Sequence, residues 1–351
     1  MTTDSYITDF DDGSLPFGWL ETSYAGLKFV FERTKKWHNN QKTLAMTAFL
    51  LLLAYSRILA PEQKQIKMKI RAYAKINLGL HVLGKRTDGY HNIETVFRLI
   101  DLYDELEIVQ ADEGTHFTSN NPELKEDNTN LCVRAANLLR DLTGTHTGVE
   151  ISLKKRIPIG AGLGGGSSDA AAALRGIAKL WSLEISQSEL QTISASLGSD
   201  VPFFFVGETA YATGRGEILE PLTLQIPYTI LVVTPKIHVS TSWAYSELKP
   251  IAGQRKLDLK ALLRDRISDH AALRSQLVND FEEPVFRTYP EIRTLKESLL
   301  NAGAIHAIMS GSGSSVFALF EDSVRAAKAQ KVFSDEYVTS VTDPSFKPEF
   351  N

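Results

Sequence analysis

The chain has 351 residues, of which 43% are hydrophobic and 23% charged, a composition typical of a globular protein with one large or two ordinary domains. Its formal net charge of −4 gives no reason to expect a nucleic-acid partner. The single cysteine, Cys132, excludes an intrachain disulfide and fits a reducing cytoplasm, and no Cys/His cluster has the spacing of zinc ligands.

The N-terminal 67 residues contain a short apolar run, Leu44–Tyr55. The apolar core of a signal peptide normally lies within the first 15–30 residues or so, and a membrane span needs about 20 apolar residues. Arg57 ends this run too early for a span. We therefore interpret residues 1–67 as an N-terminal extension, either a start-site artefact ahead of Met68 or a disordered appendage, and we expect no membrane association.

Alternating and apolar segments after Met68 predict strands followed by a helix. The predicted elements are strands at Lys69–Leu83, Asn92–Leu99 and Asp104–Gln110 and a helix at Asn130–Leu142 that ends before Gly144. Val149–Pro158 alternates and carries three consecutive basic residues, which indicates an antiparallel or edge strand with one solvent-exposed face.

The run Pro158–Leu174, PIGAGLGGGSSDAAAAL, places a glycine-rich loop directly before an apolar, alanine-rich helix. Glycine lets backbone N–H groups approach a ligand closely, and the first turn of a helix offers unpaired N–H groups at the positive end of its dipole. Together these predict a phosphate-binding loop. A flexible linker, the alternative, would not carry a buried helix.

Two better-known phosphate loops fit poorly. A Walker loop needs a lysine after its last glycine, and here Gly165 is followed by Gly166. Gly160, Gly162 and Gly165 formally match the dinucleotide pattern, but that fold needs an apolar parallel strand before the first glycine. The preceding segment is instead basic and alternating.

The rest of the chain predicts a second set of strands and helices beginning near Pro227. Ser186 and Glu189 have capping-box spacing and predict a helix that reaches Leu197 and stops at Gly198. The later predicted elements are strands at Tyr228–Thr234, Ile305–Ser310, Ser315–Phe320 and Tyr337–Val341 and helices at Thr241–Leu248, Leu257–Asp265, Phe281–Arg287, Pro290–Asn301 and Val324–Phe333. Antiparallel strands covered by helices indicate an α+β protein.

Four motifs resemble the GHMP kinase superfamily, which includes galactokinase, homoserine kinase and mevalonate kinase. They are Ala74–His81, the glycine loop, Leu197–Phe204 and Met309–Val316, in the family's order. The resemblance covers roughly Met68 to the C-terminus. It implies an N-terminal ATP-binding α+β domain (68–226), a C-terminal ferredoxin-like α+β domain (227–351), and an active site in the cleft between them.

The resemblance implies two catalytic residues, Lys75 and Asp200. Asp200 would accept the proton of the attacking hydroxyl, although a turn-forming aspartate is the commoner role in a Gly-Ser-Asp sequence. Lys75 would pair with Asp200 near the reacting hydroxyl and hold it ionised. The alternative for Lys75 is an exposed lysine on an edge strand.

The resemblance also implies the binding residues. The loop would hold the ATP phosphates through Pro158, Ile159, Gly160, Ala161, Gly162, Leu163, Gly164, Gly165, Gly166, Ser167 and Ser168. Ser167 and Ser168 would donate hydroxyls or ligate the Mg²⁺ that accompanies ATP, while Ser168 could also be a helix N-cap. Gly311 and Gly313 would let the second domain's backbone close on the phosphate region, which a simple hairpin turn would also explain.

The segment Lys85–Leu102 resembles the cytidine-binding region of those family members that phosphorylate a cytidylylated methylerythritol in the non-mevalonate isoprenoid pathway. Asn77, Tyr90 and His91 would bind this small-molecule substrate, with an aromatic face stacked on the cytosine. We therefore expect a cytoplasmic ATP-dependent kinase, as a monomer or weak homodimer. The alternatives are a homoserine or mevalonate type of kinase, or a non-catalytic binding protein on the same scaffold.

Overall fold

The structure is a computed structural model that describes residues 67–248 and 258–350. These residues belong to one compact unit, residues 66–351. The predicted N-terminal extension, with its apolar run at 44–55, lies outside the described residues. Among the helices of the described ranges, none has both the length and the hydropathy that a membrane crossing requires.

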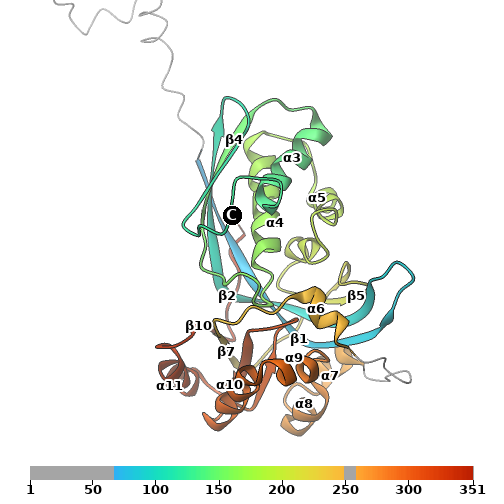
Figure 1. The fold of residues 1–351 in the computed structure, drawn as a ribbon, viewed down its shortest axis with the longest axis vertical. Coiled ribbons are helices and arrows are strands. Elements are labelled where there is room, and N and C mark those ends of the chain that lie inside the picture. The colour runs from blue at the N-terminus through green and yellow to red at the C-terminus, as the bar shows by residue number, and fades with distance from the viewer. Residues whose placement is uncertain (1–66, 249–257, 351) are drawn as a thin grey trace, which may run out of the picture. The chain divides into compact units, whose positions relative to one another are not determined.

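The first part of the described chain forms a sheet with helices on one side (Figure 1). Its elements are β1 (Lys67–Lys85), β2 (His91–Ala111), β3 (Thr115–Ser119), α3 (Leu131–Thr143), β4 (Gly148–Lys154), α4 (Gly165–Leu180), α5 (Gln187–Ser194), the 3-10 helix η2 (Val201–Phe205), β5 (Thr209–Thr213) and β6 (Ile218–Pro221). The strand order is β3-β4-β2-β5-β6, with β1 paired to β2. Only β3 and β4 run parallel within this sheet as described.

The second part forms an antiparallel sheet of four described strands in the order β10-β7-β9-β8. Its elements are β7 (Thr229–Thr234), α6 (Thr241–Ser246), α7 (Leu259–Asp265), α8 (His270–Gln276), α9 (Glu282–Thr288), α10 (Pro290–Asn301), β8 (His306–Met309), β9 (Val316–Phe320), α11 (Ser323–Phe333) and β10 (Val338–Thr342). The expected mixture of helices and antiparallel strands is confirmed. The division at residues 226 and 227 stays a prediction.

The predicted helix boundaries follow from capping side chains that the structure contains. Asn130 accepts a hydrogen bond from the Cys132 N–H at the start of α3, and Gly144 ends that helix in the left-handed conformation at φ 67°. Ser186 and Glu189 form both bonds of a capping box at α5. Helix α5 nevertheless ends at Ser194, earlier than the predicted stop at Gly198.

The strand predictions differ from the structure in detail. The segments Asn92–Leu99 and Asp104–Gln110 are two halves of one strand, β2, which pairs with β5 along its first half and with β4 along its second. The prediction of an antiparallel or edge strand at Val149–Pro158 is confirmed in its first alternative, because β4 pairs antiparallel with β2, while β3 pairs with its other side, so that it is not an edge strand. The short elements β3, β5, β6 and α8 were not predicted, since runs of four to seven residues carry little periodicity.

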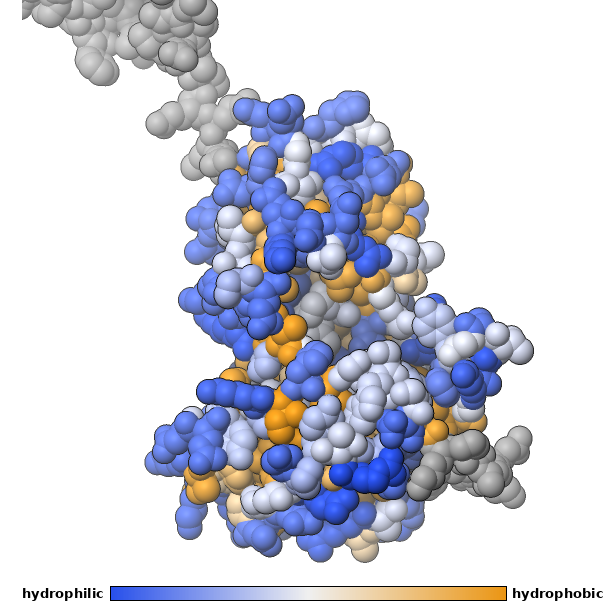
Figure 2. Space-filling model, in the orientation of Figure 1, coloured by the Kyte–Doolittle hydropathy of each residue, from blue (hydrophilic) through white to orange (hydrophobic). Residues whose placement is uncertain are grey.

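Strand β1 passes through all three hydrophobic clusters of the described chain. Ile70 packs with α3 and α4, Ile76 packs with β7 and α7, and Val82 packs with α9 and α10. A strand of 19 residues extends about 60 Å at 3.3 Å per residue, which is long enough to reach both sheets. The surface in Figure 2 narrows between the part that carries α3 and α4 and the part that carries α9 and α10. The middle of β1 therefore lies where the two parts meet.

Candidate active site

A pocket of about 380 Å³ lies at this junction. Its walls come from β1, the glycine loop, η2, the β5–β6 turn, α6 and the β8–β9 turn. The predicted site residues that line it are Lys75, Asn77, Asp200, Gly311 and the loop residues from Pro158 to Ser167. Ser168, Tyr90, His91 and Gly313 are not among the lining residues.

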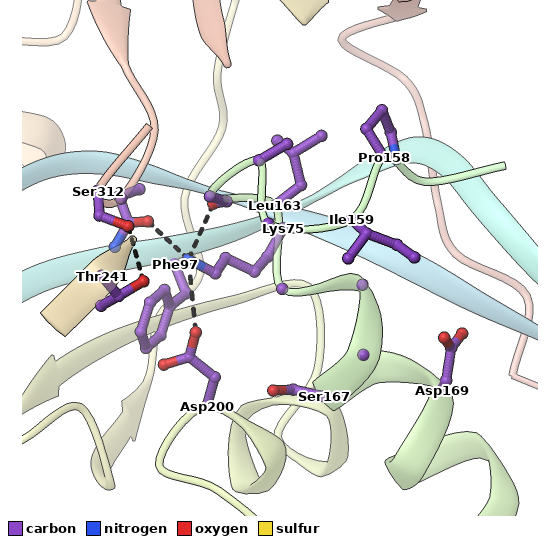
Figure 3. Close-up of a pocket in the computed structure, with 18 of the residues that line it drawn as sticks. Lys75, Phe97, Pro158, Ile159, Leu163, Ser167, Asp169, Asp200, Thr241 and Ser312 are labelled. Carbon is purple, nitrogen blue, oxygen red and sulfur yellow. Dashed lines mark hydrogen bonds and ion pairs between the residues drawn. The ribbon is translucent and has the colours of Figure 1, made fainter. Parts of the chain in front are cut away.

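Lys75 enters the pocket beside a β-bulge. The pairing of β1 with β2 shifts register between Tyr73 and Lys75, and such bulges re-aim the side chains next to them. The Lys75 side chain is buried, and its Nζ donates to Asn77 Oδ1 at 2.7 Å and to the Gly162 carbonyl at 3.3 Å (Figure 3). Burial lowers the pKa of Lys75, and the Asp200 carboxylate only partly opposes this shift.

Asp200 faces Lys75 from the opposite wall. Its Oδ2 lies 3.6 Å from Lys75 Nζ, and about a third of its side chain is exposed to the pocket (35%). The residue immediately precedes η2, where Pro202 occupies the first turn and Phe203–Phe205 are buried. The expected proximity of the ammonium and the carboxylate agrees with this distance. Their catalytic roles stay predictions.

The glycine loop exposes backbone N–H groups to the pocket. Gly160, Gly162 and Gly164 all have positive φ, and Gly164 is the N-cap of α4. The first intrahelical bond of α4 runs from the Ser168 N–H to the Gly164 carbonyl at 2.9 Å. The N–H groups of Gly165, Gly166 and Ser167 therefore have no acceptor within the helix, which leaves them available to an anion.

The two serines of the loop have different positions. Ser167 lines the pocket, and Figure 3 shows its hydroxyl on the side that faces Asp200. Ser168 is buried, does not line the pocket, and is not the N-cap, because Gly164 occupies that position. The expectation that Ser168 caps the helix was therefore wrong, and the structure does not place its side chain at the pocket wall.

A buried charge cluster beneath the loop was missed by sequence reasoning. Lys155 Nζ lies 2.5 Å from Asp104 Oδ2 and 2.7 Å from Asp169 Oδ2, and all three side chains are almost fully buried. Burial lowers the pKa of Lys155, but Asp169 and Asp104 outweigh it, so that pKa is raised. Burial also raises the pKa of Asp169 to about 8; Lys155 opposes this shift and Asp104 adds to it. Lys155 and Asp169 both line the pocket.

The predicted substrate side is arranged differently from the expectation. Asn77 lies in the pocket wall, where its amide donates to Thr95 Oγ1 at 2.9 Å. Tyr90 is 54% exposed, and His91 stacks on Tyr245 with ring centroids 4.9 Å apart. Tyr245 lines the pocket, whereas Tyr90 and His91 are not among the lining residues. No sequence signal had pointed to Tyr245.

Arg215 is a further pocket residue that sequence reasoning missed. Its guanidinium lies 4.5 Å from the centroid of the Tyr90 ring, and the residue itself lines the pocket. Its Nε is 3.5 Å from Glu217 Oε1. The β5–β6 turn that carries it also brings Gly216 close to Asp200. This turn therefore places Arg215, which lies beside Glu217, in the same pocket as the candidate base.

The glycine motif of the second part closes onto the glycine loop, as expected. The Ser310 hydroxyl donates to the Gly162 carbonyl at 3.0 Å, and the Ser315 N–H donates to the Ala161 carbonyl at 3.2 Å. Asn279 holds this turn by donating to the carbonyls of Met309 and Gly311, each at 2.7 Å. The side chains of Thr241 and Ser312 meet at 2.9 Å on the same side of the pocket (Figure 3).

Comparisons with known proteins agree with this architecture. Residues 130–208 match the family model of the GHMP kinases N terminal domain, and residues 258–339 match that of the GHMP kinases C terminal domain. The chain is 47% identical over 282 residues to the 4-diphosphocytidyl-2-C-methyl-D-erythritol kinase of Chlorobium phaeobacteroides (strain BS1), covering 80% of this chain and 98% of that protein. It is 45% identical over 282 residues to the enzyme of that name from Prosthecochloris aestuarii, again covering 80% of this chain and 98% of that protein.

Solved structures give the same result. A crystal structure of 4-(cytidine 5'-diphospho)-2C-methyl-D-erythritol kinase matches with a TM-score of 0.69 at 36% identity, covering 78% of this chain and 98% of that one. Homoserine kinase from Cytophaga hutchinsonii matches at 19% identity with a TM-score of 0.63, which shows a shared fold only. By these identities and coverages, the chain belongs to the 4-diphosphocytidyl-2-C-methyl-D-erythritol kinase family of the GHMP kinases.

Proposed function

We propose that this protein transfers the γ-phosphoryl group of ATP to a hydroxyl of 4-diphosphocytidyl-2-C-methyl-D-erythritol, the 2-hydroxyl, in non-mevalonate isoprenoid precursor biosynthesis. Family membership supports the substrate and the reaction. The observation that carries the chemistry is the pair Lys75 and Asp200, 3.6 Å apart beside the glycine loop. Phosphoryl transfer depends mainly on positioning and on stabilising charge, and this pocket supplies groups for both.

In this proposal Asp200 accepts the proton of the attacking hydroxyl. A carboxylate is a weak base for an alcohol, but it suffices when the transition state is loose and the proton leaves late. Lys75 places a positive charge beside Asp200 and the reacting oxygens. Asn77 and the Gly162 carbonyl fix the ammonium, so that it enters the reaction already oriented.

The loop N–H groups and the start of α4 would bind the ATP phosphates. Mg²⁺ prefers oxygen ligands and usually binds through one or two protein groups together with substrate phosphates. The Ser167 hydroxyl is such an oxygen at the pocket wall, so this residue fits a bound Mg²⁺ shared with the ATP phosphates. The ion, when bound, would neutralise charge on the phosphates. Ser168 is the weaker candidate ligand because its side chain is buried outside the lining.

The cytidine end of the substrate would lie toward Tyr245, which lines the pocket and stacks on His91. His91 and Tyr90 lie outside the lining. Stacking of a base on an aromatic ring contributes about 1–3 kcal/mol in nucleic-acid binders. We also propose a cytoplasmic location, a monomer or weak homodimer, and a domain boundary near residue 227. The lone, buried Cys132 fits a reducing compartment.

An ADP-release assay on the full-length protein tests the proposed function. With ATP present, we expect release of ADP with 4-diphosphocytidyl-2-C-methyl-D-erythritol and none with homoserine or mevalonate. Phosphorylation of homoserine or mevalonate, but not of the cytidylylated alcohol, would overturn the substrate assignment. Nucleotide binding without ADP release for any alcohol would instead identify a non-catalytic binding protein.

A further inference from the structure

The described C-terminal segment, residues 343–350, returns from the second sheet to the first. Figure 1 shows it running from β10 toward β1 and α4. Phe346 packs edge-on against Tyr73 of β1, with ring centroids 5.6 Å apart. The Glu349 N–H donates to the Tyr73 hydroxyl at 3.1 Å, and its carboxylate lies 2.7 Å from Arg71 Nη1. These contacts hold the segment against β1 and bring Phe350 beside α4.

Arg175 of α4 joins this segment to the candidate catalytic region. Its guanidinium lies 5.4 Å from the centroid of the Phe350 ring and 5.3 Å from that of Phe205. Its Nη1 also donates to the Phe204 carbonyl at 2.7 Å. Burial lowers the pKa of Arg175 to about 10, so the group stays charged at neutral pH. A charged donor makes a stronger hydrogen bond to a carbonyl than a neutral one does.

The Phe204 carbonyl belongs to η2, the 3-10 helix that begins directly after Asp200. The last carbonyls of a short helix lack partners within it and need donors from elsewhere. Arg175 supplies one such donor to Phe204, and Gln187 supplies another to the Phe205 carbonyl at 2.6 Å. Asp200 is the N-cap of η2, and its side chain makes no capping bond, so η2 bears on the carboxylate through the backbone of Asp200, while the ion pair with Lys75 holds its other end.

We propose that Arg175, clamped by Phe350, is a positioning residue that holds η2 so that the Asp200 carboxylate stays beside Lys75. The inference rests on the proposed role of Asp200 as the base. It assigns a function in turnover to the C-terminal segment. The Phe350 ring of that segment is linked to the site region through the guanidinium of Arg175. Arg175 itself is not among the pocket lining residues, so it acts through the backbone rather than on the substrate.

Two variants with a matched control test this proposal. Arg175→Leu removes the donor, and Phe350→Leu removes the ring face while keeping an apolar side chain. Displacement of a catalytic group by about 1 Å can cost about 100-fold in rate. We therefore expect kcat to fall by about 10- to 100-fold in Arg175→Leu and by a smaller factor in Phe350→Leu, with KM for ATP within about twofold. Val332→Ala, at an exposed position of α11 outside the C-terminal segment, should leave kcat unchanged.

A double variant separates positioning from general destabilisation. If Arg175 acts through Asp200, then adding Arg175→Leu to Asp200→Asn should lower kcat no further, because the group being positioned has already been removed. An equal fold-loss in the wild-type and Asp200→Asn backgrounds would overturn the proposal. So would an unchanged kcat in Arg175→Leu.

Hydrogen exchange gives a readout that does not depend on the substrate. The Val206 N–H donates to the Phe203 carbonyl at 3.0 Å, and it should exchange faster in Arg175→Leu and Phe350→Leu than in the Val332→Ala control. Equal exchange in all three variants would contradict the clamp. If the wild-type enzyme phosphorylates a different alcohol, the kinetic tests use that alcohol, so the proposed substrate can fail while the role of Arg175 stands.

Discussion

Gly162 and Ser310 bring the two parts of the molecule into contact at the phosphate loop. They are 148 positions apart in the sequence, yet the Ser310 hydroxyl donates to the Gly162 carbonyl at 3.0 Å. That same carbonyl accepts from Lys75 Nζ at 3.3 Å. One loop glycine is therefore bonded both to the β8–β9 turn and to the candidate catalytic lysine, so a displacement of this glycine should reach the lysine.

Replacing Gly162 by alanine should disrupt the nucleotide site. A β-carbon there would lie 2.1 Å from the Ser310 carbonyl oxygen, and the residue has φ of 79°, which side chains other than that of glycine adopt poorly. Either the loop or the β8–β9 turn has to move. We expect Gly162→Ala to lower ATP affinity at least about tenfold, measured by titration calorimetry.

Gly198→Ala is the matched control. Gly198 lies outside the pocket lining, its φ is not positive, and a β-carbon there would meet only Val201 Cγ2 at 3.5 Å. This variant should bind ATP within about twofold of wild type. If both variants bound ATP like the wild type, the close packing of Gly162 would not matter for the site.

The Lys75 and Asp200 pair should account for most of the turnover. Lys75→Met and Asp200→Asn keep the approximate volumes but remove the ammonium and the base. We expect each to lower kcat by about 10²- to 10⁴-fold, the usual contribution of a general base, while ATP binding stays measurable. Steady-state ADP release and nucleotide titration on the same preparations measure both quantities.

Near-normal turnover in either variant would refute the role assigned to that residue. Thr118→Ala serves as the control, since Thr118 pairs with Ser152 on the far side of β4, away from the pocket lining. It should leave kcat unchanged. A loss of ATP binding equal to the loss of kcat would instead indicate that the pair shapes the nucleotide site rather than the chemistry.

Much of the fold could be predicted because the signals are local. Asn130 and Gly144 bracket α3, and Ser186 with Glu189 starts α5, since capping depends on residues within a few positions. The continuity of β2 could not be predicted in the same way. Its middle interrupts the alternation of buried and exposed residues, and the register shift opposite Ala74 exists only once β1 has paired with it.

The site residues could be predicted only where they belong to short sequence motifs. Lys75, Asp200 and the glycine loop belong to four short motifs whose order is informative. The Asp104–Lys155–Asp169 cluster joins residues 51 and 14 positions apart, and nothing within any one of these segments marks them as partners. Tyr245 similarly sits on the short helix α6 and reaches the pocket only through the tertiary fold.

Replacing Tyr245 should raise KM for the cytidylylated substrate and leave KM for ATP unchanged. Its ring lines the pocket, and His91 covers one of its faces at an interplanar angle of 18°, so in the proposed complex the cytosine would contact the part of the ring that remains open to the pocket. Loss of a base stack worth about 1–3 kcal/mol corresponds to a rise in KM of about 5- to 150-fold. We expect this rise in Tyr245→Leu, with KM for ATP unchanged.

Tyr90→Leu distinguishes the two tyrosines. Tyr90 is exposed and contacts Arg215 rather than the pocket directly, so its replacement should raise KM for the substrate less than that of Tyr245. If Tyr90→Leu instead raised KM for the substrate more than Tyr245→Leu, Tyr90 would be the principal stacking residue. That result would also mean that the β1–β2 hairpin tip moves onto the bound cytosine.

The buried Asp169 should make stability depend on pH. Burial raises its pKa to about 8, with Lys155 opposing and Asp104 adding to the shift, and its Oδ1 has no hydrogen-bond partner within the described ranges. An unpaired, ionised oxygen in such a position is costly. Between about pH 4 and pH 8 the folded protein therefore retains a proton that the unfolded chain releases. This group's contribution to the free energy of unfolding should fall as pH rises through that window.

Asp169→Asn removes the titrating group while keeping a side chain of the same shape. One proton of linkage corresponds to a slope of at most about 1.4 kcal/mol per pH unit, so urea unfolding at several values between pH 5 and pH 8 should resolve it. The wild-type free energy of unfolding should decline with pH relative to that of the variant, and the two should converge in slope above pH 8. Parallel curves across the whole range would mean that Asp169 is ionised throughout and that Lys155 balances its charge fully.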